Sequence, residues 1–151
     1  MRAFADKLIN ILEKHRNDIA AEWCKGVRSN PRTPSFHKLD PAKCSANAIM
    51  FYQNLDRIYF DKKPYKAVIE YFTYYAEDNY RKKIPLHEAI YALIMMRRQM
   101  WLYAEFQAPF FTGLEHHQAV ETINKTIRVF DHGIYIMTER YLELMEAERK
   151  K

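Results

Sequence analysis

Glycine is scarce in this chain: three glycines occur in 151 residues, at positions 26, 113 and 133. Sheets joined by tight hairpins need residues in left-handed turns, a role that glycine usually fills. Loops that cradle phosphate groups need several glycines close together. The sequence therefore excludes a glycine-rich nucleotide-binding loop and argues against a β-sheet fold.

Cysteine and long apolar runs are also scarce. The chain has two cysteines, Cys24 and Cys44, and its N-terminus has no pattern of an export signal, so we expect two buried thiols and no disulfide. No apolar run approaches the 18 or so residues of a membrane-spanning helix, because the longest, at residues 89–96, stops at Arg97. We therefore expect a cytoplasmic protein.

Apolar and aromatic residues are abundant, at 48% and 15% of the chain. A chain of this length buries roughly 68–70% of its extended surface, so we expect a single domain over residues 1–151 with its own core. The net charge of +5 comes largely from short clusters at 62–63, 81–83 and 149–151. Such clusters at ends and turns predict solvated charge, and nucleic acid is not an expected partner.

Apolar residues recur at intervals of three and four along the whole chain, which predicts an all-α fold. We expect a four- to five-helix bundle with a long C-terminal helix and short connections. The prolines at 31 and 34 end the first helix, and Asp40 and Pro41 begin the second. The expected helices cover about 3–28, 41–60, 65–81, 85–109 and a long segment after Gly113.

The last helix has a strict heptad pattern of apolar residues, which is typical of a narrow seam facing one partner helix. The partner is either another helix of the same chain or a second subunit, and a homodimer through this seam is expected on the second alternative. The seam residues are Val120, Ile123, Ile127, Phe130, Ile134, Met137, Tyr141 and Leu144. The candidate self-association residues are Ile127, Phe130, Ile134, Met137 and Tyr141.

The segment LIMMRRQMW, residues 93–101, places two arginines inside an apolar run. Helical spacing predicts that Arg97 faces inward and Arg98 outward. On one interpretation Arg97 pairs with a buried acid such as Asp131, a pair that costs roughly 3–5 kcal/mol to break from one side. On the other, Arg97 and Trp101 line a pocket for an anionic or aromatic ligand.

Patterns for metals and catalysis are absent. No histidine follows a glutamate at the spacing of a di-iron bundle, and His117 with Glu121 supplies only two metal ligands. Haem is an alternative through His15 or His132, although hydrogen-bonded core histidines explain both. No nucleophile motif occurs, so we expect no enzyme, metal or cofactor. The candidate ligand-binding residues are Arg97, Trp101, His132, Asp131, His15 and Trp23.

Three segments carry a family resemblance: IAAEWCKGVRSNPRTPSF, IPLHEAIYALIMMRRQMWLYAEF and ETINKTIRVFDHGIYIMTERYLE. Together the chain resembles the N-terminal domain of RsbRD-type RsbT co-antagonists, which is also found ahead of bacterial sensor kinases. The resemblance implies a non-enzymatic sensory domain of bacterial stress or two-component signalling, either stand-alone or excised from a longer protein.

From this we expect an input domain that senses a ligand or partner and transmits through its C-terminal helix. Its output is a signalling protein or a fused domain. A stand-alone small-molecule or haem-binding protein is the alternative.

Overall fold

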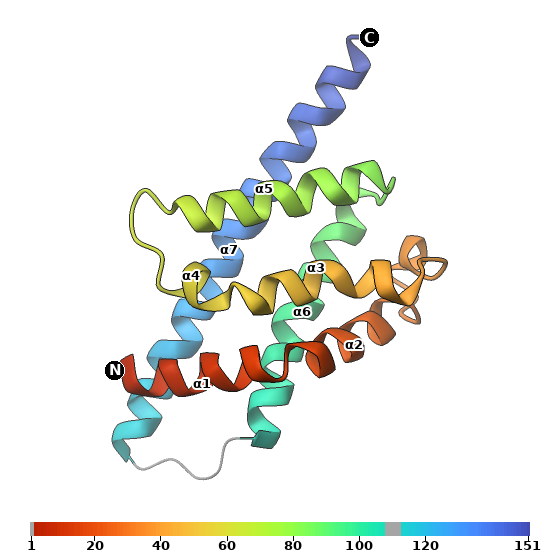
Figure 1. The fold of residues 1–151 in the computed structure, drawn as a ribbon. Coiled ribbons are helices and arrows are strands. Elements are labelled where there is room, and N and C mark those ends of the chain that lie inside the picture. Colours follow the sequence, from red (N-terminus) through yellow and green to blue (C-terminus); the bar gives the residue numbers. More distant parts are fainter. Residues whose placement is uncertain (1, 108–112) are drawn as a thin grey trace.

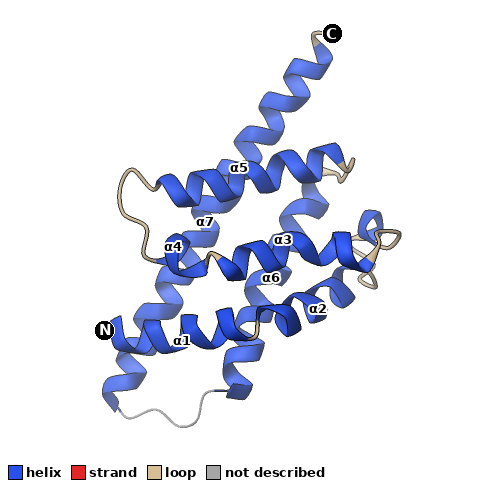
Figure 2. Ribbon diagram, in the orientation of Figure 1, coloured by secondary structure: helices blue, strands red, loops and turns tan. Residues whose placement is uncertain are grey.

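The computed structural model describes the backbone of residues 2–107 and 113–151, and the side chains of residues 5–102, 117–118 and 120–151. Every regular element in these ranges is a helix, with no strand (Figure 2). The all-α prediction is therefore confirmed. The turn expected near Pro109 lies outside the described residues.

Two of the expected helices are interrupted. The first bends at His15, and the second breaks at Asn54, whose side-chain amide donates to the Met50 carbonyl at 2.8 Å. Asparagine often competes for backbone groups in this way, which weakens a helix at that point. The helices are α1 (Arg2–Lys14), α2 (Arg16–Val27), α3 (Pro41–Gln53), α4 (Leu55–Tyr59), α5 (Lys66–Arg81), α6 (Leu86–Gln107) and α7 (Gly113–Arg149), with a 3₁₀ turn at Pro34–Phe36.

The helices form two layers. In the front layer, the α1–α2 pair, the α3–α4 pair and α5 lie as three rows. In the back layer, α6 and α7 cross behind these rows as an antiparallel pair (Figure 1). Helix α7 contacts α1, α4, α5 and α6, so it runs across most of the bundle. Each interrupted pair occupies one row, which is why five expected helices describe the arrangement well.

The core joins both layers through aromatic rings. Phe130 of α7 is buried, and its ring centroid lies 5.3 Å from that of Phe51 on α3 and 6.3 Å from that of Phe72 on α5. The rings meet edge to face, an arrangement that aromatic pairs favour. The middle of the expected seam therefore lies inside the protein's own core.

Polar tips of buried aromatic residues anchor the front layer to α6. The indole of Trp23 donates to the Ala92 carbonyl at 2.8 Å, and the hydroxyls of Tyr52 and Tyr75 donate to carbonyls of α6 at 3.0 and 3.1 Å. Burial raises the pKa of both tyrosines. Both tyrosines therefore keep their protons at physiological pH. Donation to backbone carbonyls satisfies the hydroxyl groups of these buried side chains.

The prediction of one continuous seam along α7 is wrong. Val120 is 55% exposed, and Ile123 and Ile127 are each 39% exposed. The inward positions of this half belong to Thr122 and Thr126, which are buried. Their hydroxyls donate to carbonyls one turn earlier at 2.8 and 2.9 Å, so these polar side chains enter the core without an unsatisfied donor.

The self-association candidates are corrected accordingly. Phe130, Met137 and Tyr141 are at most 2% exposed and are buried in the bundle of their own chain, so they are not available to a second subunit. Only Ile127 and Ile134 of the five keep exposed surface.

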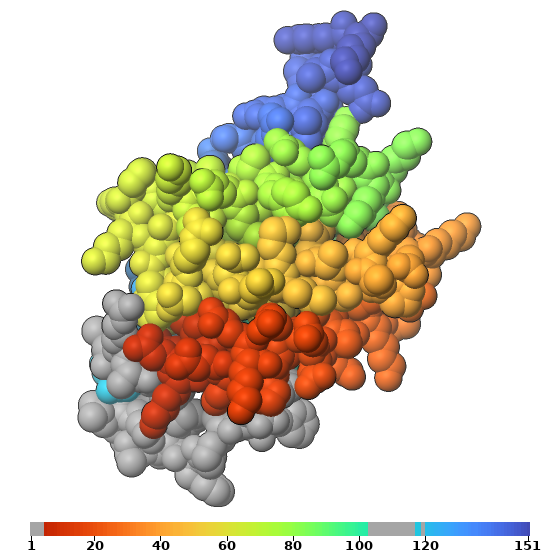
Figure 3. Space-filling model, in the orientation of Figure 1, coloured from red at the N-terminus to blue at the C-terminus, as the bar shows by residue number. Residues whose placement is uncertain are grey.

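The C-terminal end of α7 extends beyond the bundle (Figure 3). Near this end α7 contacts α5 and the turn after it: the Tyr141 hydroxyl donates to the Ile84 carbonyl at 3.0 Å, and Arg140 donates to Glu77 at 3.0 Å. The Tyr80 hydroxyl also donates to the carboxylate of Glu148. Residues 145–150 are all exposed. No helix in the described ranges is both long and apolar enough to cross a membrane.

Candidate ligand-binding pocket

A cavity of about 510 Å³ opens between α4, the start of α5 and α7. Its apolar wall is formed by Ile58 and Val68 from the front layer and by Val129 and Ile136 from α7. Polar and charged side chains, namely Asp61, Tyr65, Lys125, Arg128 and His132, surround this wall. The volume falls in the range of about 300–1,000 Å³ that is typical of small-molecule sites.

The basic side of the pocket comes from one helix. Lys125, Arg128 and His132 follow each other at intervals of three and four residues, which places them on one side of α7. All three line the cavity. Helical spacing alone therefore brings two formal positive charges and an imidazole to the same opening.

Aromatic rings at the C-terminal end of α4, Tyr59 and the following Phe60, contact the Lys125 ammonium group. Its Nζ lies 4.9 Å from the ring centroid of Tyr59 and 5.1 Å from that of Phe60, distances at which cation–π attraction is effective. Tyr59 is itself fixed, because its hydroxyl donates to the Thr122 carbonyl at 3.2 Å. Burial raises the pKa of Tyr59, so its hydroxyl stays protonated beside the cationic groups of Lys125 and Arg128.

Tyr65 and His132 both line the pocket, and their rings stack with centroids 5.9 Å apart and an interplanar angle of 28°. Tyr65 has a φ of 58°, in the left-handed region, and directly precedes α5. Left-handed backbone is uncommon for a bulky residue and is noted most often at turns or functional sites. This conformation directs the turn so that Tyr65 reaches α7.

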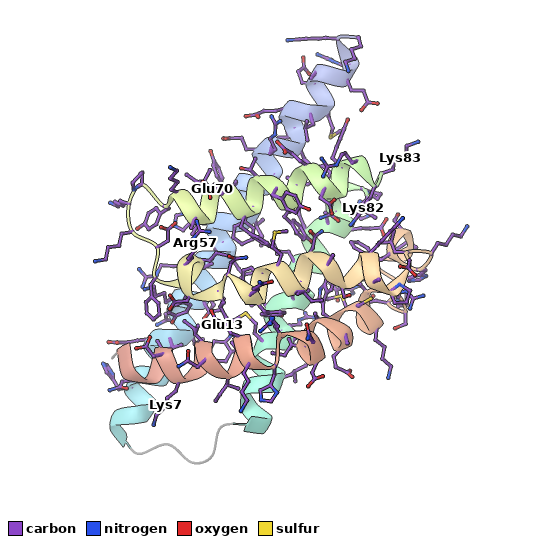
Figure 4. All side chains as sticks on the ribbon, viewed as in Figure 1. Lys7, Glu13, Arg57, Glu70, Lys82 and Lys83 are labelled. Atoms are coloured by element: carbon purple, nitrogen blue, oxygen red, sulfur yellow. The ribbon has the colours of Figure 1, made fainter. Side chains whose placement is uncertain are left out.

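Asp61 is the one carboxylate among the described residues that line the pocket, and each of its oxygens accepts a hydrogen bond from a backbone amide. One oxygen accepts from the Val68 amide at 3.0 Å, and the other accepts from the Lys62 amide at 3.1 Å. Asp61 thus caps the first turn of α5. On the outer face, Arg57 and Glu70 point toward each other at 3.5 Å and join α4 to α5 (Figure 4).

The guanidinium group of Arg128 has no hydrogen bond or ion pair with any residue whose side chain is described. Lys125 and Arg128 supply two positive charges against the single negative charge of Asp61, so the lining carries a formal excess of one positive charge before His132 is counted. An exposed guanidinium beside an apolar cavity is a ready partner for an anion.

The ligand candidates from the sequence do not form one site. Only His132 lines the pocket. Trp23 is a core residue, and Arg97 with Trp101 lies half-buried at the margin of α6. The inward position expected for Arg97 is taken by Met96, because the buried face of α6 runs through Ala89, Ala92, Leu93, Met96 and Met100.

The proposed pairing of Arg97 with Asp131 is wrong. Asp131 is exposed on α7, and no ion pair joins it to Arg97 within the described side chains. Arg98 faces outward as predicted, and its guanidinium donates to the Tyr91 hydroxyl at 3.4 Å. His15 lies at the bend between α1 and α2, 3.9 Å from Asp18.

The metal and thiol candidates remain local contacts. His117 and Glu121 lie 3.1 Å apart, and no group of three metal-binding side chains occurs among the described residues. Cys24 and Cys44 are buried free thiols, which confirms the expected burial. Burial raises the pKa of Cys44 well above the ordinary thiol value, so it is a poor nucleophile.

Sequence reasoning missed Lys125, Arg128, Tyr59 and Tyr65. The spacing of Lys125, Arg128 and His132 predicts that they share one side of α7, whereas the apolar heptad marks another face of the same helix. No family model, curated protein or solved structure matches the chain. The functional proposal therefore depends on the geometry of the pocket and of α7.

Proposed function

We propose that this protein is a non-enzymatic sensory domain in which α7 reports the occupancy of the pocket. The observation that carries the proposal is the continuity of α7. This one unbroken helix supplies Lys125, Arg128, Val129, His132 and Ile136 to the pocket and then continues to Arg149, beyond the bundle. A displacement of the helix at the pocket would therefore be expressed at its far end.

The mechanism requires two arrangements of α7 with different affinities for the ligand, since a ligand shifts an equilibrium only through such a difference. Between the pocket and the C-terminus, α7 is held by Tyr141 and Arg140 at the end of α5. These contacts act as a pivot, about which small movements at the pocket tilt the last turns. Helix shifts of this kind are a common switching motion.

The output partner would contact the last turns of α7. Leu142 and Met145 expose apolar side chains there, flanked by the charged residues Glu143, Glu146 and Arg149. This combination is typical of helices that pair with another helix. The resemblance to input domains of bacterial signalling proteins agrees with such an output. We also propose that the protein is cytoplasmic.

A homodimer would use only the first part of the expected seam, because Phe130, Met137 and Tyr141 are buried. Val120, Ile123 and Ile127 form an exposed apolar face on the first half of α7. We expect the wild-type protein to sediment as a dimer at tens of micromolar and Ile127→Glu to sediment as a monomer. A monomeric wild type at that concentration would remove self-association from the proposal without affecting the pocket.

A stand-alone binding protein is the second candidate, and the cavity volume supports it equally well. The two functions differ in whether α7 moves. On either one, no catalytic step is assigned to the side chains around the pocket.

Movement of α7 can be tested by a substitution that fills the pocket with a side chain of the protein itself. Ile69 lines the cavity from α5 and is 46% exposed, so Ile69→Trp can place an aromatic ring there with little cost to the core. Spin labels at Asn17→Cys on α2 and Ala147→Cys on α7 measure the position of the helix end. Both sites are exposed, whereas the native thiols are buried.

We expect Ile69→Trp to shift the distribution of distances between the two labels. Tyr74→Trp is the matched control, because Tyr74 is an exposed residue of α5 that does not line the pocket. An unchanged distribution in a folded Ile69→Trp protein would contradict transmission through α7 and favour the stand-alone binding protein.

A further inference from the structure

We propose that the pocket between α5 and α7 binds a small amphipathic anion: an apolar aromatic or aliphatic body that carries one carboxylate or a chemically similar acidic group. The inference deepens the proposed function by naming the ligand class of that site. Its test measures occupancy alone, so it succeeds or fails independently of any movement of α7.

The apolar body is indicated by uncovered apolar surface inside the cavity. Val68 and Ile58 form one wall, and Val129 faces them from α7. Ile69 remains 46% exposed although it belongs to the same lining. Covering such surface is the main source of affinity for an apolar ligand. The cavity of about 510 Å³ has room for a small molecule and not for a folded partner.

The acidic group is indicated by the two cations of α7. Lys125 is positioned by the rings of Tyr59 and Phe60, at 4.9 and 5.1 Å. Arg128 lies three residues further along the same side of the helix, and no described side chain occupies its guanidinium group. Residues at this spacing are neighbours on a helix surface, so both can reach one anionic group.

The opposing charge at the pocket does not cancel this preference. Asp61 accepts hydrogen bonds from the amides of Val68, in the first turn of α5, and Lys62, in the preceding turn, at 3.0 and 3.1 Å. A cationic ligand would be repelled by Lys125 and Arg128, and Asp61, whose oxygens already accept two backbone amides, is the one described carboxylate of the lining that could pair with it. A neutral ligand would leave the exposed Arg128 guanidinium to water and would gain no charge-assisted hydrogen bond from it. The charge pattern thus selects an anion.

The experiment compares two fluorescent probes with the same ring system. The first is 8-anilinonaphthalene-1-sulfonate, which has an anionic group, and the second is N-phenyl-1-naphthylamine, which lacks it. Each is titrated against the full chain and against Arg128→Gln, Lys125→Gln and Ile69→Trp. Arg149→Gln is the matched control, because it removes the same charge from the same helix outside the pocket.

We expect one sulfonate probe per chain. Arg128→Gln and Lys125→Gln should each weaken its binding about tenfold, the effect of losing one charge-assisted contact. Both variants should bind the neutral probe as the wild type does, which also shows that they remain folded. Ile69→Trp should weaken both probes, and decanoate should displace the sulfonate probe from the wild type at a concentration about tenfold lower than decanol requires.

Three results would overturn the inference. The first is the absence of saturable binding of the sulfonate probe. The second is equal weakening by Arg149→Gln and Arg128→Gln, which would indicate general attraction to a basic protein. The third is sulfonate-probe binding that survives Ile69→Trp but is lost in Ile123→Ser, which would place the probe on the exposed apolar face of α7. Tight binding combined with fixed label distances would retain the inference and refute the proposed function.

Discussion

Gly133 of α7 lies directly against the ring of Phe72 on α5: a Cβ atom added at Gly133 would come within 2.4 Å of Phe72 Cε1 and Cζ. Glycine is needed here because the two helices approach closely, and no unusual backbone angle is involved. The contact lies next to His132, the pocket residue that precedes it in the chain. The same close crossing therefore fixes the separation of α5 and α7 at the pocket.

We expect Gly133→Ala to destabilise the protein. Alanine is favoured over glycine in a helix by about 1 kcal/mol, but overpacking against a core ring typically costs about 1–3 kcal/mol. The approach of 2.4 Å to a fully buried ring puts the overpacking cost in the upper part of this range, so the net loss should be about 1–2 kcal/mol of unfolding free energy, measured by urea titration. Gly26→Ala is the control, because its added Cβ would meet only the flexible end of Met95, at 3.2 Å. A Gly133→Ala protein as stable as the wild type would show that α5 and α7 separate easily.

Tyr141→Phe should loosen the pivot of α7 without changing its shape. The substitution removes the hydrogen bond that the Tyr141 hydroxyl donates to the Ile84 carbonyl at 3.0 Å, and it leaves a buried acceptor unpaired. We expect a loss of about 1–2 kcal/mol in urea unfolding. Tyr135→Phe, at a site that is 68% exposed, should have almost no effect. Equal effects of the two substitutions would argue against a specific anchor at Tyr141.

Asp78 should make the protein sensitive to acid. Burial raises its pKa, but hydrogen bonds from Lys82 and Asn47 outweigh burial, and the pKa lies below the ordinary value of 3.8. The carboxylate therefore stabilises the fold above about pH 3.8, and this contribution is lost as the pH falls through the lower pKa of the folded state.

Asp78→Asn should accordingly cost about 1–2 kcal/mol at pH 7, for the loss of charge-assisted hydrogen bonds. Its unfolding free energy should fall less steeply than that of the wild type between about pH 5 and pH 2. Asp131→Asn, at an exposed position of α7, is the control. Parallel pH profiles for Asp78→Asn and the wild type would contradict this assignment.

The helices could be predicted from the sequence because local signals mark them. Pro41 occupies the first position of α3, as its place after Asp40 predicts, and α5 ends at Arg81 as expected. The bend at His15 carries no comparable signal. Apolar residues keep their helical spacing on both sides of His15, so the sequence predicts a single helix there.

The inward face of α7 could not be predicted in the same way. Hydropathy favours Ile123 and Ile127 as core residues over Thr122 and Thr126. The structure reverses this order: both threonines are buried, and each satisfies its hydroxyl within α7. Such a choice depends on the distance between helices, which one sequence does not contain.

The pocket depends on residues that are distant in the chain. Its charged side comes from residues 125–132, and its other rim comes from the turn at Asp61 and Tyr65. Helical spacing predicts that Lys125 and Arg128 share a side, but it does not predict that Tyr59 and Tyr65 lie opposite them. Only the packing of α4 and α5 on α7 creates the cavity.

The central claim is that an anion bound beside Arg128 is reported at the far end of α7. The most direct measurement follows the distance between labels at positions 17 and 147 while 8-anilinonaphthalene-1-sulfonate is titrated into the protein. We expect the distance to change with the same midpoint as probe fluorescence, and Arg128→Gln to shift both midpoints together. A saturated pocket with an unchanged distance between the labels would contradict it.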